Sequence, residues 1–401
     1  MNRSKTHHPW LYLILSVCII TPFANDTYVP SLVDMAHVFK TNNISLVMTV
    51  FMVGLGASQL FYGPLSDRFG RKPVLLFGLL IFMVASVVIV FADSFAMLLW
   101  GRFFQAVGTC STIVSAMAIA RDIYPADKIV KIISMIMAII GFCAVIAPFW
   151  GSFLQSLLGW QGPFIFLLVL GIGYFVIITF MFKESQKSRN YHALKPVQLY
   201  GNYRLLLRVN AYCAYIITSA CSYGALFAYA AASSIIIVGQ FHYSVIAYGA
   251  LFSINSVAIV LMSILAPKLN KYLSIDRLVL IGALLLSTGS AITLIVNLVL
   301  NASIWSLVLP MWVATLGVAM IRPTASSGAM STAPVEISGS AAALFNFMSF
   351  IGGALSTFVI ACLQVNPVNF SLFILLLGMM ACLVIIYTFG FKLSADKELQ
   401  Q

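Results

Sequence analysis

Charged side chains are scarce in this chain of 401 residues. Lysine and arginine together number 22, aspartate and glutamate only 11, and the four types make up 8% of the sequence. Hydrophobic residues account for 61%, and the mean hydropathy is +1.02. These values lie far outside the range of soluble globular domains. The composition therefore predicts a membrane protein.

Histidine and cysteine are too few and too scattered to build a redox or metal centre. No histidine falls inside a long apolar run, so we expect no haem, metal or histidine relay within the bilayer. The seven cysteines are odd in number and dispersed, which argues against a disulfide framework and favours a packing role. The five histidines are His7, His8, His37, His192 and His242.

Catalytic signatures are also missing. The chain has no Ser-His-Asp layout, no Gly-x4-Gly-Lys-Ser/Thr phosphate loop and no His-Glu-x-x-His pair. We therefore expect neither an intramembrane enzyme nor an ATP-driven pump, and no metal or organic cofactor.

Long apolar runs dominate the sequence, and each is long enough to cross roughly 30 Å of hydrocarbon as a helix. They are continuously apolar rather than alternating, which indicates helices. The sequence thus predicts an all-α polytopic membrane protein with twelve transmembrane helices. The runs are Trp10–Ser31, Ser45–Leu65, Pro73–Ala92, Phe95–Ala120, Ile132–Leu154, Pro163–Phe182, Val209–Ser233, Ser244–Ala266, Leu278–Leu300, Ile304–Ile321, Ile337–Leu363 and Val368–Phe391.

The net charge of +11 is distributed by topology rather than as a nucleic-acid-binding patch. If the N-terminus is cytoplasmic, nineteen of the 22 basic residues fall on the cytoplasmic side; the exceptions are Lys40, Arg102 and Arg322. This asymmetry is the positive-inside pattern. It predicts that both termini are cytoplasmic, and it leaves no reason to expect a nucleic-acid partner.

One polar break divides the chain into two halves. We expect residues 10–182 to form a six-helix half, 183–208 a cytoplasmic linker, and 209–391 a second six-helix half. A shift of 203 residues places Pro64 on Pro267 and Asp67 on Asn270, a weak internal repeat. Two pseudo-symmetric halves are typical of transporters that alternate access around a midplane site.

An ionisable residue inside a span is costly, so it is a candidate functional residue. Asp26 lies in the first span and Arg102 in the fourth. A carboxylate in a low-dielectric cavity is destabilised in its charged form, so it can exchange a proton near physiological pH. Asp26 is therefore the candidate proton carrier. The alternatives are that Asp26 is structural, paired with Arg102 or bonded to backbone, and that Arg102 extends towards the membrane surface.

Polar and aromatic side chains within the spans are candidates for lining a solute cavity. For any one of them ordinary packing is the competing interpretation. The candidates are Asn25, Tyr28, Gln105, Phe142, Tyr215, Tyr223, Asn255, Trp312 and Asn346. In the fifth span, Pro148 removes a backbone donor and small residues near it allow close helix approach.

Several motifs resemble those of the major facilitator superfamily. Residues 63–72 are similar to its loop 2–3 signature, and residues 102–108 to the fourth-helix motif of its drug:proton antiporters, with Ala106 where glycine is usual. Residues 147–152 resemble the fifth-helix antiporter motif, with one glycine replaced by Ser152. Residues 25–30 and 120–125 resemble the bicyclomycin/chloramphenicol-resistance (Bcr/CflA) branch.

The resemblance implies roles for these residues. Asp26 would be the protonatable carboxylate and Arg102 the base that modulates it. Pro148 and Gly151 would shape a gate, and Cys18 occupies a position where some relatives carry a second acid, which favours a single protonation site. A conformational latch, with Asp67 facing the start of the eleventh span, would comprise Gly63, Asp67, Arg68, Gly70, Arg71 and Lys72.

Together these features predict a proton-coupled antiporter that exports drugs or other small organic solutes across a bacterial inner membrane by alternating access. Its partners would be the solute, protons and the lipid bilayer, its energy source the proton gradient, and its working form a monomer. Two alternatives stay open: a dedicated exporter of an endogenous metabolite such as a siderophore or amino-acid derivative, and a non-transporting sensor on the same fold.

Overall fold

The computed structural model describes residues 10–186, 196–299, 303–334, 337–363 and 365–398, and within these ranges it contains helices and connecting turns but no strand. His7, His8, His192 and part of the predicted linker, residues 187–195, lie outside the described residues, as do the basic residues at positions 3 and 5.

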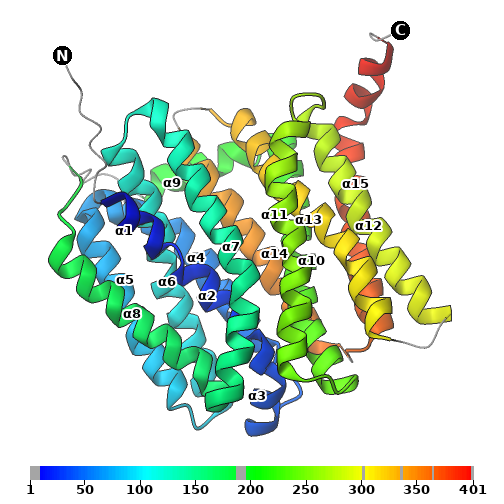
Figure 1. Cartoon of the computed structure of the whole chain (residues 1–401). Helices are drawn as coiled ribbons and strands as arrows, with labels where there is room; N and C mark the ends of the chain where they lie inside the picture. The colour runs from blue at the N-terminus through cyan, green and yellow to red at the C-terminus, as the bar shows by residue number, and fades with distance from the viewer. Residues whose placement is uncertain (1–9, 187–195, 300–302, 335–336, 364, 399–401) are drawn as a thin grey trace.

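The helices form two groups, which stand left and right in Figure 1. The first group contains α1 (Trp10–Val17), α2 (Ile20–Asp26), the 3-10 turn η1 (Val29–Ser31), α3 (Leu32–Val38), α4 (Leu46–Phe69), α5 (Arg71–Val90), α6 (Phe95–Ile123), α7 (Ala126–Leu158), the 3-10 turn η2 (Gly159–Gln161) and α8 (Gly162–Met181). Helix α9 (Pro196–Leu206) follows in the predicted linker. The second group contains α10 (Asn210–Ser234), the π-helix η3 (Ile235–Gln240), α11 (Val245–Leu269), α12 (Ile275–Val299), α13 (Ile304–Thr332), α14 (Ser338–Cys362) and α15 (Pro367–Glu398).

Twelve membrane-crossing segments can be assigned among the described helices, with α9 lying in the linker between the sixth and the seventh. Ten helical stretches among the described residues are long and apolar enough to span a membrane, and one of them, residues 131–181, contains both α7 and α8 on either side of the turn at Gly159. The first segment is the twelfth; its pieces are individually too short. The prediction of an all-α polytopic membrane protein is confirmed.

The first segment departs from the predicted continuous helix. It is divided into α1, α2 and η1, and Pro30 is the second residue of η1. Proline has no N–H to donate, so the helical hydrogen-bond ladder is interrupted there. The Thr27 hydroxyl donates to the Phe23 carbonyl oxygen at 2.6 Å, which satisfies one group at the break. The break leaves Asp26 as the last residue of α2.

Other boundaries also differ from the expectation. Helix α13 runs to Thr332, although the predicted span ends at Ile321; the extra turns include Arg322 and Pro323. The predicted linker contains a helix, α9, and its Asn202 donates a hydrogen bond to Ser340 in the first turn of α14. Hydropathy marks only the part of a helix that crosses hydrocarbon, so more polar extensions are not visible to it.

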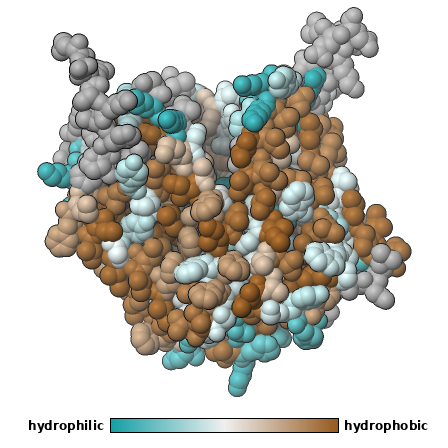
Figure 2. Space-filling model, viewed as in Figure 1, coloured by the Kyte–Doolittle hydropathy of each residue, from teal (hydrophilic) through white to brown (hydrophobic). Residues whose placement is uncertain are grey.

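The two groups meet along two helix pairs. Helix α7 packs against α11, and α4 packs against α14. The hydroxyls of Thr49 on α4 and Thr357 on α14 share a hydrogen bond of 2.9 Å. Both residues lie far from the face where α1 begins and α15 ends, which we call the terminal face. At the terminal face the space-filling view shows a hollow between the groups, while hydrophobic residues cover the flanks (Figure 2).

In each half, a pair of glycines allows two neighbouring helices to pack closely. A Cβ added to Gly108 on α6 would meet the Gly78 carbonyl oxygen on α5 at 2.5 Å, and one added to Gly317 on α13 would overlap the Gly282 carbonyl oxygen on α12. Small residues let backbones approach closely, and dispersion contacts then supply the attraction that lipid cannot.

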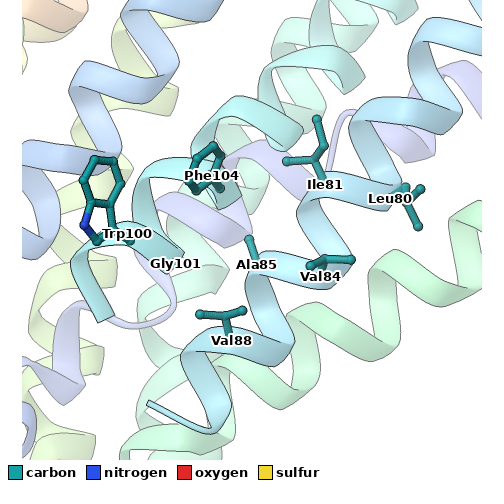
Figure 3. Close-up of a pocket in the computed structure, with 8 residues that line it drawn as sticks. All are labelled: Leu80, Ile81, Val84, Ala85, Val88, Trp100, Gly101 and Phe104. Atoms are coloured by element: carbon teal, nitrogen blue, oxygen red, sulfur yellow. The ribbon is translucent and has the colours of Figure 1, made fainter. Parts of the chain in front are cut away.

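An apolar groove of about 480 Å³ lies between α5 and α6 (Figure 3). Its lining is apolar apart from the indole nitrogen of Trp100, and Leu80, Val84, Trp100 and Phe104 are exposed. An exposed apolar surface on membrane-spanning helices matches hydrocarbon rather than a polar solute. None of the predicted site residues lines this groove, so the candidate site lies elsewhere.

The glycine contact between α12 and α13 predicts a stability difference. Gly317→Ala should destabilise the protein by about 1–3 kcal/mol, because the new methyl would press on α12. Gly173 on α8 is the control, because a Cβ there meets nothing within 4 Å. Alanine is intrinsically the better helix former by about 1 kcal/mol, so Gly173→Ala should be neutral or stabilising. Thermal unfolding in detergent measures both; equal melting temperatures would contradict the packing argument.

Candidate functional site

Asp26 lies at the break in the first membrane segment, where α2 ends and η1 has not begun. Its side chain is partly buried, and the Asn25 amide donates a hydrogen bond of 2.6 Å to its Oδ1 atom. The Oδ1 atom of Asn25 is buried and has no hydrogen-bond partner among the described residues. The Asp26 carboxylate at the helix break is therefore held by the adjacent Asn25, whose own carbonyl oxygen is still able to accept a hydrogen bond.

Arg102 on α6 is fully buried beside the same segment. Its Nη1 atom donates to the Ala24 carbonyl oxygen at 3.2 Å and to the Gln105 side chain. The guanidinium carbon stands 3.8 Å from the ring centre of Tyr28 and 4.0 Å from that of Phe51. Desolvated cation–π contacts contribute about 2 kcal/mol or more. Arginine is thus stabilised by rings and amides, not by extending to the membrane surface.

Asp26 and Arg102 do not form an ion pair in this conformation. Arg102 binds the carbonyl of Ala24, two residues before Asp26, yet both ion pairs found among the described residues involve Arg71. The Nε and Nη2 atoms of Arg102 are buried without a hydrogen-bond partner in the part of the chain that the structure describes. A buried unsatisfied donor costs about 1–3 kcal/mol, more when charged. This conformation thus keeps a buried cation with available donors on the helix that packs against the first segment.

Helix α7 presses on the same segment from the other side. A Cβ on Gly151 would overlap the backbone carbonyl of Thr27, so only glycine allows this approach. One turn further, the Ser31 hydroxyl donates to Gln155 at 2.9 Å, and Gln155 in turn donates to the Asp34 carboxylate. Pro148 lies inside α7 one turn before Ser152, whose hydroxyl donates to the Pro148 carbonyl oxygen.

The same helix reaches the second half. A Cβ on Gly249 of α11 would overlap the Ser152 hydroxyl. Gly151 and Ser152 therefore face two directions: one contacts the segment that carries Asp26, the other contacts α11. A movement of the first segment and a movement between the halves would therefore both change the contacts of α7.

The charged turn between α4 and α5 is organised around Arg71. Its guanidinium donates to Asp67 at 2.6 Å, to Ser66 at 2.9 Å and, through Nε, to Asp122 at 2.9 Å. Arg71 is largely buried, with 10% of its side chain exposed, whereas Asp67 is 45% exposed. One arginine thus connects the end of α4, the start of α5 and the end of α6.

Glu184, just after α8, completes this network. Its two carboxylate oxygens accept the backbone N–H groups of Arg71 and Lys72, each at 3.1 Å. These are the first N–H groups of α5, which have no partner within the helix, and the positive end of the helix dipole favours an anion there. Gly70 just before them has φ of 106°, a backbone conformation that favours glycine. The Lys72 ammonium donates to the Thr179 carbonyl oxygen at 2.9 Å.

The remaining motif positions are less constrained. The Arg68 guanidinium lies 5.3 Å from the centre of the neighbouring Phe69 ring. A Cβ on Gly63 would meet nothing within 4 Å, so space does not demand glycine there. The Asp67 carboxylate is bound by Arg71, within its own half, and among the described residues no ion pair joins it to α14, whose start the resemblance implied it would face. The terminal face is open in this conformation (Figure 2).

The predicted cavity residues fall into three groups. Tyr28 and Gln105 are buried against Arg102, and Gln105 also donates to Ser86 at 2.9 Å. Tyr215 and Asn255 are buried and bonded within the second half, to Asp276 and Thr315 respectively, so neither offers a free polar group. The others differ in exposure: Phe142 is 64% exposed, Trp312 and Asn346 are partly buried, and Tyr223 is buried beneath Arg322.

Sequence reasoning did not find three of these contributors. Asp122 lies in the quoted segment 120–125, but nothing local pairs it with Arg71, 51 positions away. Glu184 reads as an ordinary linker acid, and Gln155 as one more polar residue near a helix end. Their roles depend on which helix ends meet, and that is a property of the tertiary structure.

Comparisons with known proteins agree on one family. The model of the Major Facilitator Superfamily matches residues 14–357. A bicyclomycin resistance protein homolog of Haemophilus influenzae is 26% identical over 393 residues, covering 96% of both chains. Multidrug resistance protein D of Escherichia coli (strain K12) is 28% identical, with 96% of both chains covered. A chloramphenicol resistance protein of Pseudomonas aeruginosa is 27% identical, covering 90% of this chain and 88% of its own.

Solved structures share the architecture. A D-xylose-proton symporter superposes with a TM-score of 0.76 at 15% identity, covering 94% of this chain and 97% of its own. A peptide transporter, POT, in complex with sulfate gives a TM-score of 0.77 at 15% identity, covering 97% and 96%. At this identity the likeness concerns the fold alone.

The Arg71 network predicts unequal effects for two arginines of one motif. Arg71→Gln should destabilise the protein by roughly 1–3 kcal/mol, because Asp67 and Asp122 lose a charged hydrogen-bond donor. Arg68→Gln should have little effect, since Arg68 contacts only the ring next to it. Thermal unfolding in detergent compares them. If Arg68→Gln proved as costly as Arg71→Gln, general charge loss would explain the effect and the network would not.

The contact between Gly151 and Thr27 predicts a local effect. Gly151→Ala should displace the first segment and weaken its hydrogen bonds, from Thr27 N–H to Phe23 and from Ser31 N–H to Tyr28. Backbone hydrogen exchange over residues 19–31 should then be faster than in the wild type. Gly141→Ala, on the same helix but with no atom within 4 Å of the new methyl, is the control. Identical exchange in both variants would disprove the contact.

Proposed function

The chain belongs to the major facilitator superfamily, and from this premise we propose that it is a proton-coupled antiporter that exports drugs or other small organic solutes across the bacterial inner membrane. The observation that carries the proposal is the Asp26 carboxylate at the break in the first segment, which is partly buried and makes no ion pair among the described residues. A carboxylate fixed in an ion pair would be structural, whereas one without a permanent cation partner suits proton exchange.

Alternating access is supported by where the halves touch. Contacts between α7 and α11 and between α4 and α14 hold the halves together away from the terminal face, while a hollow is open at that face (Figure 2). The distribution of lysine and arginine makes the terminal face cytoplasmic. The conformation is then the one that admits a solute from the cytoplasm.

Proton exchange in this scheme uses Asp26. In the outward-open state the carboxylate takes up a proton; in the inward-open state it releases that proton to the cytoplasm as solute binds. The deprotonated carboxylate would be attracted to the guanidinium of Arg102 in the same half, whose Nε and Nη2 atoms are available. Because Asp26 ends α2, the pairing would pull on η1 and on the Gly151 contact with α7. Protonation is in this way linked to the helix that packs on the second half.

The loop motif has a proposed part in the cycle. We assign Gly63, Asp67, Arg68, Gly70, Arg71 and Lys72 to a latch that contacts the second half, at the start of α14, when the terminal face closes. In the open conformation Arg71 keeps Asp67 and Asp122 in place. We also assign Pro148 and Gly151 to the gate. The protein would work as a monomer, with both termini cytoplasmic.

Drug export is favoured over the two alternatives by the relatives. Those that match along nearly the whole chain bear the names bicyclomycin resistance protein homolog, multidrug resistance protein D and chloramphenicol resistance protein. Neither a dedicated metabolite exporter nor a sensor is suggested by these names.

The decisive test is proton-driven flux in proteoliposomes. Asp26→Asn should reduce pH-gradient-driven export of a panel of lipophilic cations, neutral drugs and siderophores to the level of empty liposomes, because an amide cannot carry a proton. Asp93→Asn, the same substitution at an exposed loop position, should transport as the wild type does. Full gradient-driven export by Asp26→Asn would overturn the proton assignment. Absence of flux from the wild type across the whole panel would overturn drug export.

A further inference from the structure

Arg322 is a cation on α13, directly after the predicted apolar span, for which the proton mechanism has no use. It lies on α13 ten residues before the helix ends at Thr332, which is about 15 Å at 1.5 Å per residue. Its side chain is exposed, in contrast to the fully buried Arg102. A charged residue inside a membrane span is costly and normally faces a water-filled cavity or a partner. The question is which of these Arg322 faces.

The packing of α13 answers it. Gly317 and Ile321 face α12, where a Cβ on Gly282 would meet both. Arg322 comes seven residues after Thr315, so the two share a face of the helix about two turns apart. Thr315 hydrogen bonds with Asn255 on α11, inside the molecule. Arg322 therefore points away from α12, which stands at the outer edge in Figure 1, and towards the interior. An exposed side chain there faces the cleft between the halves.

The guanidinium lies on one ring of an aromatic cluster. Its carbon lies 3.9 Å from the centre of the Tyr223 ring on α10. The Tyr223 ring in turn packs against Phe227 and Phe350, each with ring centres 5.5 Å apart. Phe350 touches the first half, because a Cβ on Gly56 of α4 would lie 3.2 Å from its Cβ. The cation thus stands where the two halves meet, on an aromatic base.

Arg322 forms no ion pair with an acid in the part of the chain that the structure describes. Neither ion pair found among the described residues includes it, whereas Arg71 is flanked by two carboxylates. A guanidinium offers five N–H donors in a planar fork that matches a carboxylate or phosphate. The Tyr223 ring covers one face of that fork and leaves its edge to the cleft. The position therefore offers a cation, hydrogen-bond donors and aromatic rings to an anionic group.

We propose that Arg322, held on the ring of Tyr223, binds an anionic group of the exported solute, and that the solute's aromatic part rests against the partly exposed ring of Phe350. The solute class is then an amphipathic aromatic anion or zwitterion. This inference rests on the proposed export function and specifies its substrate. It also separates two tasks: the first half carries the proton at Asp26, and the second half supplies the cation that recognises the solute.

A matched pair of probes isolates the charge. 1-Naphthaleneacetate and 1-naphthaleneacetamide have the same ring and nearly the same size, and differ in carrying a carboxylate or a neutral amide. Equilibrium dialysis against the purified full chain in a neutral detergent, with binding to protein-free micelles subtracted, gives both affinities. The wild type should bind the acid about tenfold more tightly, as expected for one hydrogen bond to a charged group. Arg322→Gln should lose this preference while binding the amide as before.

Two variants serve as controls. Arg322→Lys keeps the charge and should keep part of the preference, and Arg204→Gln removes an exposed arginine of α9 and should keep all of it. Equal affinity of the wild type for the two probes would overturn the proposal, and so would an undiminished preference in Arg322→Gln. An equal loss of both probes in Arg322→Gln would assign Arg322 to packing with Tyr223. If Arg322→Gln does not fold, the wild-type comparison and Arg322→Lys still decide.

The outcome is distinguishable from failure of the export function. Probe preference is an equilibrium measurement and needs no pH gradient, so Asp26→Asn should retain it. A clear preference for the acid without gradient-driven flux would leave the anion site standing and remove the antiporter. Gradient-driven flux without any preference would do the reverse.

Discussion

The burial of Arg102 is the constraint on which the first half depends. A guanidinium without water is tolerated only where rings, carbonyls and amides replace its hydration. Tyr28, Phe51, Gln105 and the Ala24 carbonyl provide that replacement, and three of them lie outside the helix that carries the arginine. The first membrane segment must therefore pass close to α6. It can present Ala24 and Tyr28 to the same cation because the two residues are four positions apart and lie on one face of the segment.

The break in the first segment connects local backbone chemistry to the proposed mechanism. Pro30 interrupts the helical ladder, and Asp26 becomes the end of a short helix rather than the middle of a long one. A helix end is easier to move than a helix interior, since fewer backbone hydrogen bonds fix it. Gly151 then places α7 directly against Thr27, so the movable segment has a rigid neighbour that also packs on the second half. In the proposed mechanism, α7 is therefore the element that links proton binding at Asp26 to the contact between the halves.

The two halves use the same kind of glycine-mediated helix packing but differ in how their charged residues are arranged. Both use a glycine pair to bring neighbouring helices together, at Gly78 with Gly108 and at Gly282 with Gly317. The first half adds an ion network around Arg71 that ties the ends of three helices to Glu184, as expected for a part that moves as a unit. At the corresponding turn of the second half Asn270 replaces the acid. Its central cation, Arg322, is left facing the cleft, where a solute rather than a side chain can meet it.

The sequence by itself determined the membrane class and the twelve spans, and it predicted the six-plus-six division and the two intramembrane candidates Asp26 and Arg102. Hydropathy, the distribution of positive charge and the cost of a charge in lipid are local or additive along the chain, so they can be read without a structure. The tertiary structure alone decided the broken first segment's partners, the union of Arg71 with Asp122 and Glu184, and the placement of Tyr215 and Asn255 in satisfied contacts. These depend on which helix ends and faces meet, over separations of up to 124 positions. The same holds for Arg322: the sequence shows an arginine near a span, but only the packing of α13 against α12 and α11 turns it towards the cleft.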